Sequence, residues 1–192
     1  MELKNLILDG TLRVFHRKGL KFTMDDLAKE LSMSKKTIYT IFPDKESLFF
    51  TMVEHIFDRI KESEQAIIED TSLPTLEKIH KILGVLPEGY QNVDLQKLYP
   101  LKEKYPKIYR EVESRLENGW EPTLCLLEQG MKEGVIRPVP LSLVKMMLEA
   151  SVEQFFQRDV LVRNHLGYSE ALREVVEILV YGIAVRNGDK NE

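Results

Sequence analysis

The stretch SMSKKTIYTIF, Ser32 to Phe42, separates into two faces when it is wound into a helix. Ile38 and Phe42 stand four residues apart, so they share an inner face with Met33. The opposite face carries polar side chains, namely Lys36, Tyr39 and Thr40. Lysine donates to guanine or to phosphate, threonine offers a hydroxyl and a methyl group to thymine, and tyrosine combines ring contact with a phosphate hydrogen bond. This outer face therefore has the chemistry that a DNA groove requires.

The residues around this stretch predict a helix-turn-helix. Thr23 can cap a helix over TMDDLAKEL, in which Asp26 suits the positive end of the helix dipole. Ser32 begins the turn, Ser34 caps a very short second helix, and Pro43 ends it. A helix, a turn and a second helix with an outward polar face form the pattern of a DNA-binding unit. An ordinary helical pair with a solvated face is the alternative.

The whole chain has the apolar spacing of helices. Apolar residues recur three and four positions apart, and alternating strand patterns bounded by turn pairs are missing. Gly19 can end the first helix in the left-handed conformation, and Pro122 predicts a kink near Trp120 within one long helix. We expect an all-α protein with a DNA-binding domain over 1–46 and a second helical domain over 47–192. The expected helices cover 3–18, 23–31, 35–41, 44–70, 74–84, about 94–104, 107–132, 141–162 and 169–186.

The composition limits where a polyanion can bind. Lys plus Arg total 27 and Asp plus Glu 31, a net charge of −4, so any nucleic-acid surface must be local. Residues 1–50 hold nine Lys or Arg against seven Asp or Glu, a net of +2, and the remainder therefore carries −6. The single cysteine excludes an internal disulfide, and neither a signal peptide nor an apolar run of about 18 residues is evident. We expect a cytoplasmic protein with no membrane partner.

The run ILDGTLRVFHRKGLKFTMDDLAKELSMSKKTIYTIFPDKESLF, Ile7 to Phe49, resembles the DNA-binding region of the TetR family of bacterial repressors. The resemblance covers about a quarter of the chain and runs without a gap. It rests on the combination of Phe15, Gly19, Thr23, Leu27, Ala28, Ser34, Thr37, Tyr39, Phe42, Lys45 and Leu48. It implies a three-helix DNA-binding domain followed by a helical ligand-binding and dimerisation domain, about nine helices in all.

The resemblance also implies which residues meet DNA. Thr23 would hold a phosphate at the start of its helix, and Lys45 would clamp another. The remaining positions belong to the cap and outer face of the recognition helix, and they are Ser34, Lys35, Lys36, Thr37, Tyr39 and Thr40. Ser32 replaces the usual turn glycine, and Ile41 replaces a common histidine that contacts phosphate. The family's frequent basic arm before the first helix is absent, so minor-groove contacts are not expected.

Wide apolar stripes on the last two helices predict a homodimer. These stripes exceed what one hairpin neighbour buries, and a two-fold four-helix bundle would cover them. A dimer also matches palindromic half-sites on double-stranded DNA. Packing of both stripes inside the monomer is the alternative. The predicted interface comprises Val144, Met147, Leu148, Val152, Phe155, Leu172, Val176, Leu179 and Ile183.

Aromatic and methionine side chains of the second domain predict an apolar pocket for a small effector. The expected lining is Tyr99, Tyr105, Trp120, Met131 and Phe156, although such residues are more often core. The resulting hypothesis is a homodimeric repressor of a palindromic operator that a small hydrophobic ligand releases. A regulator that works without a small ligand is the first alternative.

A helical-bundle enzyme or metal protein is the more distant alternative. Di-iron bundles use two Glu-x-x-His motifs, and Glu77 to His80 is one such spacing without a second. Cys125 has no basic partner nearby in the sequence and is expected to be a buried, inert thiol. We therefore expect no catalytic residues, no metal site and no cofactor.

Overall fold

The computed structural model describes residues 2–86, 100–157 and 159–185, with the backbone alone for 156 and 157. Within these ranges the chain is helical, and its β-structure is limited to one isolated bridge between Ile136 and Ala184. The helices are α1 Glu2–Lys18, η1 Gly19–Lys21, α2 Met24–Glu30, α3 Lys35–Tyr39, α4 Lys45–Glu69, α5 Thr75–Leu83, α6 Leu101–Lys104, α7 Pro106–Glu117, α8 Glu121–Lys132, α9 Leu141–Gln157, α10 Val160–Arg163 and α11 Tyr168–Ile183. The all-α prediction is confirmed.

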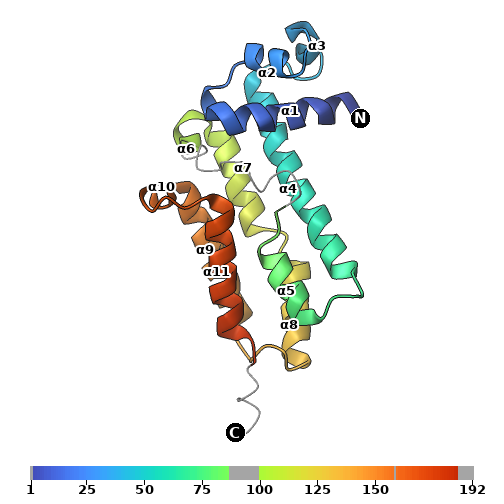
Figure 1. The fold of residues 1–192 in the computed structure, drawn as a ribbon, viewed down its shortest axis with the longest axis vertical. Coiled ribbons are helices and arrows are strands. Elements are labelled where there is room, and N and C mark those ends of the chain that lie inside the picture. Colours follow the sequence, from blue (N-terminus) through green and yellow to red (C-terminus); the bar gives the residue numbers. More distant parts are fainter. Residues whose placement is uncertain (1, 87–99, 158, 186–192) are drawn as a thin grey trace.

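The molecule is elongated, with α1, α2 and α3 at one end (Figure 1). Helix α4 starts among them and runs along the molecule toward the far end, where α5 and α8 lie. Helix α7 packs beside α4, and α9 and α11 pack against each other along the opposite side. A single long helix thus joins the helix-turn-helix to the rest of the chain.

The predicted helix starts are confirmed by their side-chain hydrogen bonds. Thr23 Oγ1 accepts from the Asp26 backbone N–H at 3.2 Å, and the Asp26 carboxylate accepts from the Thr23 N–H at 2.9 Å, which completes a capping box. Asp44 forms the same kind of capping box with Ser47 at the start of α4, and the Ser34 side chain caps α3 by accepting from the Thr37 N–H. Gly19 takes a φ of 57°, the left-handed conformation expected at the end of α1. Local sequence therefore determines where these helices begin and end.

The predicted long helix over 107–132 is wrong in one respect, because the chain breaks at residues 118–120. Gly119 adopts a φ of 77° between α7 and α8, a conformation that few other residues tolerate. Pro122 lies in the first turn of α8, where its missing N–H breaks no helical hydrogen bond, so it begins a helix instead of kinking one. The predicted helix over 141–162 likewise divides into α9 and the short α10. Segments too short to predict thus raise the number of helices above nine.

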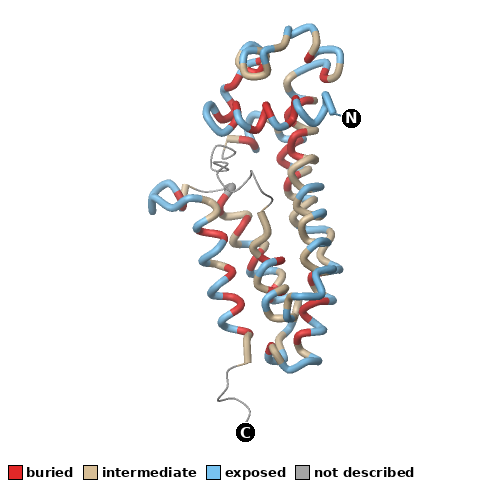
Figure 2. The backbone as a smooth tube through the Cα atoms, turned by 45° about the vertical axis from the view of Figure 1, so that its right-hand side comes forward, coloured by how far each residue is buried: buried red, intermediate tan, exposed pale blue. Residues whose placement is uncertain are grey.

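The buried residues form two main clusters, and exposed and buried positions alternate along the outer helices (Figure 2). The N-terminal cluster combines α1, α2, α3 and the first half of α4 with Leu101, Ile108, Tyr109 and Val112. The C-terminal cluster combines α5, α8, α9 and α11. The N-terminal cluster thus extends across the predicted domain boundary at 46 and includes residues of α6 and α7.

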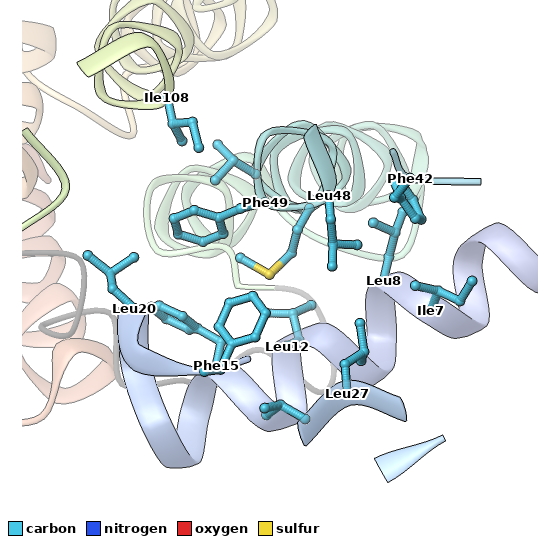
Figure 3. Packing of buried hydrophobic residues seen from close by; sticks show 14 of the residues in the cluster. Ile7, Leu8, Leu12, Phe15, Leu20, Leu27, Phe42, Leu48, Phe49 and Ile108 are labelled. Atoms are coloured by element: carbon cyan, nitrogen blue, oxygen red, sulfur yellow. The ribbon is translucent and has the colours of Figure 1, made fainter. Parts of the chain in front are cut away.

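The ring of Phe49 is completely buried in the N-terminal cluster. Its side chain points toward those of α1 and lies near Ile108 of α7 (Figure 3). Its centroid is 5.7 Å from that of Phe15, 6.4 Å from that of Phe22 and 5.6 Å from that of Tyr105. Edge-on and tilted pairs at these distances stabilise a core beyond the area they bury. Phe49 therefore holds α1, the segment after η1 and the start of α7 against α4.

None of the helices within the described ranges combines the length and the apolar character needed to cross a membrane.

Replacing Phe49 with alanine should lower the free energy of unfolding by about 3–5 kcal/mol, because it leaves a cavity among three rings. Phe50→Ala is the control, since its half-buried side chain only borders the same cluster. Urea denaturation followed by circular dichroism measures both. Equal losses of unfolding free energy in the two variants would contradict the role of Phe49 as the residue that joins the three rings.

Candidate nucleic-acid interface and ligand cavity

Helix α3 exposes the face that the sequence predicts for DNA. Ile38 and Phe42 are 0% and 3% exposed and anchor the helix in the N-terminal cluster. Lys36, Tyr39 and Thr40 are exposed on the other side, with Tyr39 at 45%. The two faces therefore separate as predicted, and the outer one is accessible to a DNA groove.

The hydroxyl groups of α3 are held by bonds within the helix. Ser34 Oγ accepts from the Thr37 N–H at 3.1 Å and lies 2.9 Å from Thr37 Oγ1. Thr40 Oγ1 donates to the Thr37 carbonyl at 2.6 Å, which fixes its orientation on the outer face. These bonds stabilise a five-residue helix that is too short to persist alone.

The acidic residues of α2 are neutralised within the domain. The four ion pairs are Arg13–Glu30 at 2.8 Å, Arg17–Glu30, Lys18–Asp26 at 2.6 Å and Lys35–Asp25 at 3.0 Å. Hydrogen bonds from Arg13 and Arg17 lower the pKa of Glu30, and the bond to Asp25 raises the pKa of Lys35. Such exposed pairs contribute little stability, but they remove the negative charge that would repel phosphates.

Lys45 faces inward, although the resemblance to the family assigns it to a phosphate. Its Nζ donates to the Leu20 carbonyl at 2.8 Å and lies 4.3 Å from the centroid of the Phe22 ring. Burial lowers the pKa of Lys45 accordingly. In this conformation the ammonium ties the start of α4 to η1, and a phosphate contact would require the side chain to swing outward.

The predicted dimer residues are mostly covered by their own chain. Eight of the nine are buried at 9% exposure or less, which leaves Met147 at 46% as the one with substantial free area. Most of these residues belong to the C-terminal cluster, in which α11 contacts α5 and α9 contacts α7 and α11, so their own chain leaves little of their area free for a partner. The helical periodicity of the sequence identifies these apolar residues but does not show which neighbouring helix buries them. Among the described side chains of α9 and α11, the exposed large apolar residues are Leu143, Met146, Met147, Ile178 and Tyr181.

A cavity of about 110 Å³ lies among α4, α5, α7, α8, α9 and α11. Of the predicted lining, Trp120 borders it, and its indole N–H donates to the Leu116 carbonyl at 2.7 Å. Tyr105 instead packs on Phe49, and Met131 borders the C-terminal cluster. Tyr99 and the side chain of Phe156 lie outside the described residues. The sequence missed the α4 side of this cavity, formed by Phe57, Ile60, Lys61 and Glu64.

Within the described residues, the candidate metal ligands and the cysteine do not come together in one site. His80 Nε2 lies 2.8 Å from Glu177 on α11, while Glu77 pairs with Lys81 at 3.1 Å. The described residues contain no group of three or more side chains suited to a metal ion. Cys125 is exposed, so the expectation of a buried thiol is wrong: it lies on the outer side of α8.

Comparison with known proteins identifies one family. The model of the bacterial regulatory proteins of the tetR family matches residues 7–52. An uncharacterised HTH-type transcriptional regulator of Bacillus subtilis, YvaF, is 30% identical over 177 residues, covering 92% of this chain and 93% of that protein.

Solved structures share the fold over nearly the whole chain. A TetR transcription regulator from Haloarcula marismortui has a TM-score of 0.70 at 15% identity, covering 96% of this chain and 99% of its own. A putative transcriptional regulator from Saccharomonospora viridis in complex with choline has the same TM-score at 18% identity and the same coverage.

Asp26→Asn should lower the urea midpoint at about pH 7 and have less effect at about pH 2.5. The Lys18 ammonium and the Thr23 N–H hold the pKa of Asp26 at about 2, below its ordinary value of 3.8. Because the folded pKa is depressed, the ionised group stabilises the fold above the unfolded pKa and loses this effect as the pH falls toward 2. Glu128→Gln, an exposed carboxylate on α8, is the control. If the difference in urea midpoint between Asp26→Asn and the unsubstituted protein stayed constant with pH, the depressed pKa of Asp26 would be refuted.

Proposed function

Because this chain belongs to the TetR family of bacterial transcriptional regulators, we propose that it represses transcription as a homodimer on a palindromic operator and is released by a small ligand. The family accounts for DNA binding and transcription regulation, and it is not enzymatic. The repressor mode, the dimer and the ligand are the proposed parts. The observation that carries the proposal is the exposed face of α3, held outward by the buried Ile38.

The DNA-reading role rests on charge as well as exposure. Lys36 is exposed and has no ion-pair partner within the described ranges, whereas Lys35 is engaged by Asp25. An unpaired lysine on a recognition helix can donate to a base edge or to phosphate without first breaking a salt bridge. We therefore assign direct DNA contact to Lys36, Tyr39 and Thr40. Thr23, Ser34, Lys35 and Thr37 complete the proposed surface through backbone positioning and phosphate contact. Lys45 would join it after its side chain swings away from the Leu20 carbonyl.

The proposal of a homodimer is supported by the exposed apolar residues of α9 and α11. Ile178 and Tyr181 are 70% and 67% exposed on α11, and α9 adds Leu143, Met146 and Met147. The two helices pack against each other, so both can contribute to one surface. Large apolar side chains gathered on neighbouring helices are typical of an interface. A two-fold axis through this surface would give the two α3 helices the symmetry of a palindrome.

Ligand release rests on the contact between the cavity and α4. Phe57 and Ile60 of α4 line the cavity, and the same helix carries Phe49 in the N-terminal cluster. A volume of about 110 Å³ is small beside the several hundred cubic ångströms of ordinary ligand sites. A ligand would therefore have to push the surrounding helices apart, and moving α4 changes the position of α3. The choline complex of the S. viridis relative shows that a protein of this fold holds a small molecule.

Lys36→Ala should weaken binding to the selected operator about tenfold or more, since it removes a donor from the recognition face. Tyr39→Phe should also weaken binding while retaining the ring. Lys29→Ala, which removes an exposed lysine from α2, is the matched control and should have little effect. Electrophoretic mobility shift at fixed salt, with a site selected from random duplexes, measures all three. If Lys29→Ala lost as much operator affinity as Lys36→Ala, the DNA would not bind at the outer face of α3.

Ile178→Asp should raise the dimer dissociation constant by about 100-fold or more, because it puts an unpaired charge in an apolar interface. Analytical ultracentrifugation measures the assembly, and circular dichroism checks the fold. Leu6→Asp is the control, since Leu6 is 46% exposed on α1 and distant in sequence from the proposed interface. An unchanged dimer in Ile178→Asp would move the interface away from α11.

A further inference from the structure

The cavity contains ionisable side chains as well as apolar walls. Lys61 and Glu64 come from α4, Arg115 from α7 and Glu149 from α9. Most of the remaining lining is aliphatic or aromatic, including Phe57, Ile60, Leu86, Leu148, Val152 and Trp120. The charge that a ligand should carry depends on which of the four groups already have partners.

Lys61 and Arg115, the cations of the described lining, each already donate to two protein oxygens. Lys61 Nζ donates to Glu64 Oε2 at 2.7 Å and to the Gly119 carbonyl at 2.8 Å. Arg115 donates to Glu111 at 2.9 Å and to Asp58 at 3.1 Å. An anionic ligand would compete with these carboxylates for the same cations and would have to lose its own hydration in a small, largely apolar space. The cavity is therefore poorly suited to a carboxylate or a phosphate.

Glu149 lacks the donor that a buried carboxylate oxygen needs. Its Oε1 is buried and accepts no hydrogen bond from any described residue. Lys145 Nζ forms an ion pair with this oxygen at 3.4 Å, which is longer than the usual charge-assisted hydrogen bond of about 2.7–2.9 Å. The same ammonium donates to the Glu117 carbonyl at 2.8 Å instead. An acceptor on a lining residue of the cavity thus has no hydrogen-bond donor among the described residues, which is unfavourable for a buried polar atom.

Trp120 lines the same cavity as Glu149, and its ring already lies near a cation. Lys145 Nζ is 5.9 Å from the centroid of the indole ring, within reach of a cation–π interaction. The indole N–H is occupied by the Leu116 carbonyl, so the ring offers its π surface and not its donor. Burial also raises the pKa of Glu64 despite its bond to Lys61. Because burial destabilises the ionised carboxylate, a further positive charge near Glu64 would be favourable.

From this geometry we infer that the cavity takes an organic ammonium, whose N–H donates to Glu149 Oε1 and whose apolar group packs against Trp120 and the aliphatic wall. The inference rests on the proposed function, because it specifies the ligand of the same effector site. The ligand's ammonium supplies the missing donor, and it takes the place beside Trp120 that Lys145 fills only at long range. A compact alkyl group needs the least widening of a cavity of about 110 Å³, since an engineered cavity of about 150 Å³ holds benzene.

Three probes of one shape isolate the effect of charge. 3,3-Dimethylbutylamine, 3,3-dimethyl-1-butanol and 3,3-dimethylbutanoate share a tert-butyl group and differ in carrying an ammonium, a hydroxyl or a carboxylate. Trp120 is the single tryptophan of the chain, so its fluorescence reports on the cavity alone. Titration of the full-length protein near neutral pH, where an alkylamine is protonated, gives the three dissociation constants.

The amine should bind about tenfold or more tightly than the alcohol, and the carboxylate should bind more weakly than either. Glu149→Gln should abolish the preference for the amine while keeping the affinity for the alcohol. Glu128→Gln, which removes one exposed carboxylate from α8, is the matched control and should keep the preference. Circular dichroism establishes that each variant is folded. Equal affinities for amine and alcohol, tighter binding of the carboxylate, or no fluorescence response to any probe would overturn the inference.

Operator binding, measured with each probe present, separates this inference from the proposed function. Release of DNA by the alcohol as readily as by the amine would retain effector control and refute the preference for ammonium. Amine binding with the expected preference but unchanged DNA affinity would establish the ligand class and refute release as the mechanism.

Discussion

The ring of Phe49 is the contact on which the relation between the two halves of the molecule depends. Phe15 and Phe22 approach it from the helix-turn-helix side, and Tyr105 approaches it from the start of α7. Because the three rings meet one residue of α4, the DNA-binding helices and α7 are held against the same helix. Close-packed rings of this kind have few alternative arrangements, so a displacement of α4 would carry the DNA-binding end of the molecule with it.

Helix α4 carries this constraint from the DNA surface to the cavity. Phe49 and Glu64 are about 22 Å apart along its axis at the usual rise per residue. A displacement at the cavity therefore reaches α3 through a continuous helix and a packed core instead of through loops. Lys45 adds a second attachment, since its ammonium joins the start of α4 to the Leu20 carbonyl. The cavity and the recognition helix are mechanically connected, and a ligand can use that connection only if it binds one helix arrangement better than another.

Local sequence predicted the features that depend on neighbouring residues. The caps at Thr23 and Ser34 and the left-handed Gly19 were predictable because each is settled within one helical turn. The break at Gly119 was missed because the apolar period continues across it. Helical periodicity alone also could not show that most of the apolar residues predicted for a dimer interface are already buried in a cluster with residues of α5 and α8. Contacts between distant segments decide such questions.

The ionisable residues that line the cavity could not be predicted from local sequence either, and their positions decide which ligand the cavity can bind. Glu64 and Glu149 belong to α4 and α9, and nothing in their local sequence indicates that they line one space. Once they do, each is partly served by a lysine of its own helix, Lys61 at 2.7 Å and Lys145 at 3.4 Å. The bond on α4 is short and complete, whereas the pair on α9 is long and leaves an oxygen without a donor. A cation entering the cavity therefore gains most at α9 while its apolar part presses on α4. Binding would change the separation of these two helices, and α4 would transmit that change to the DNA-reading face.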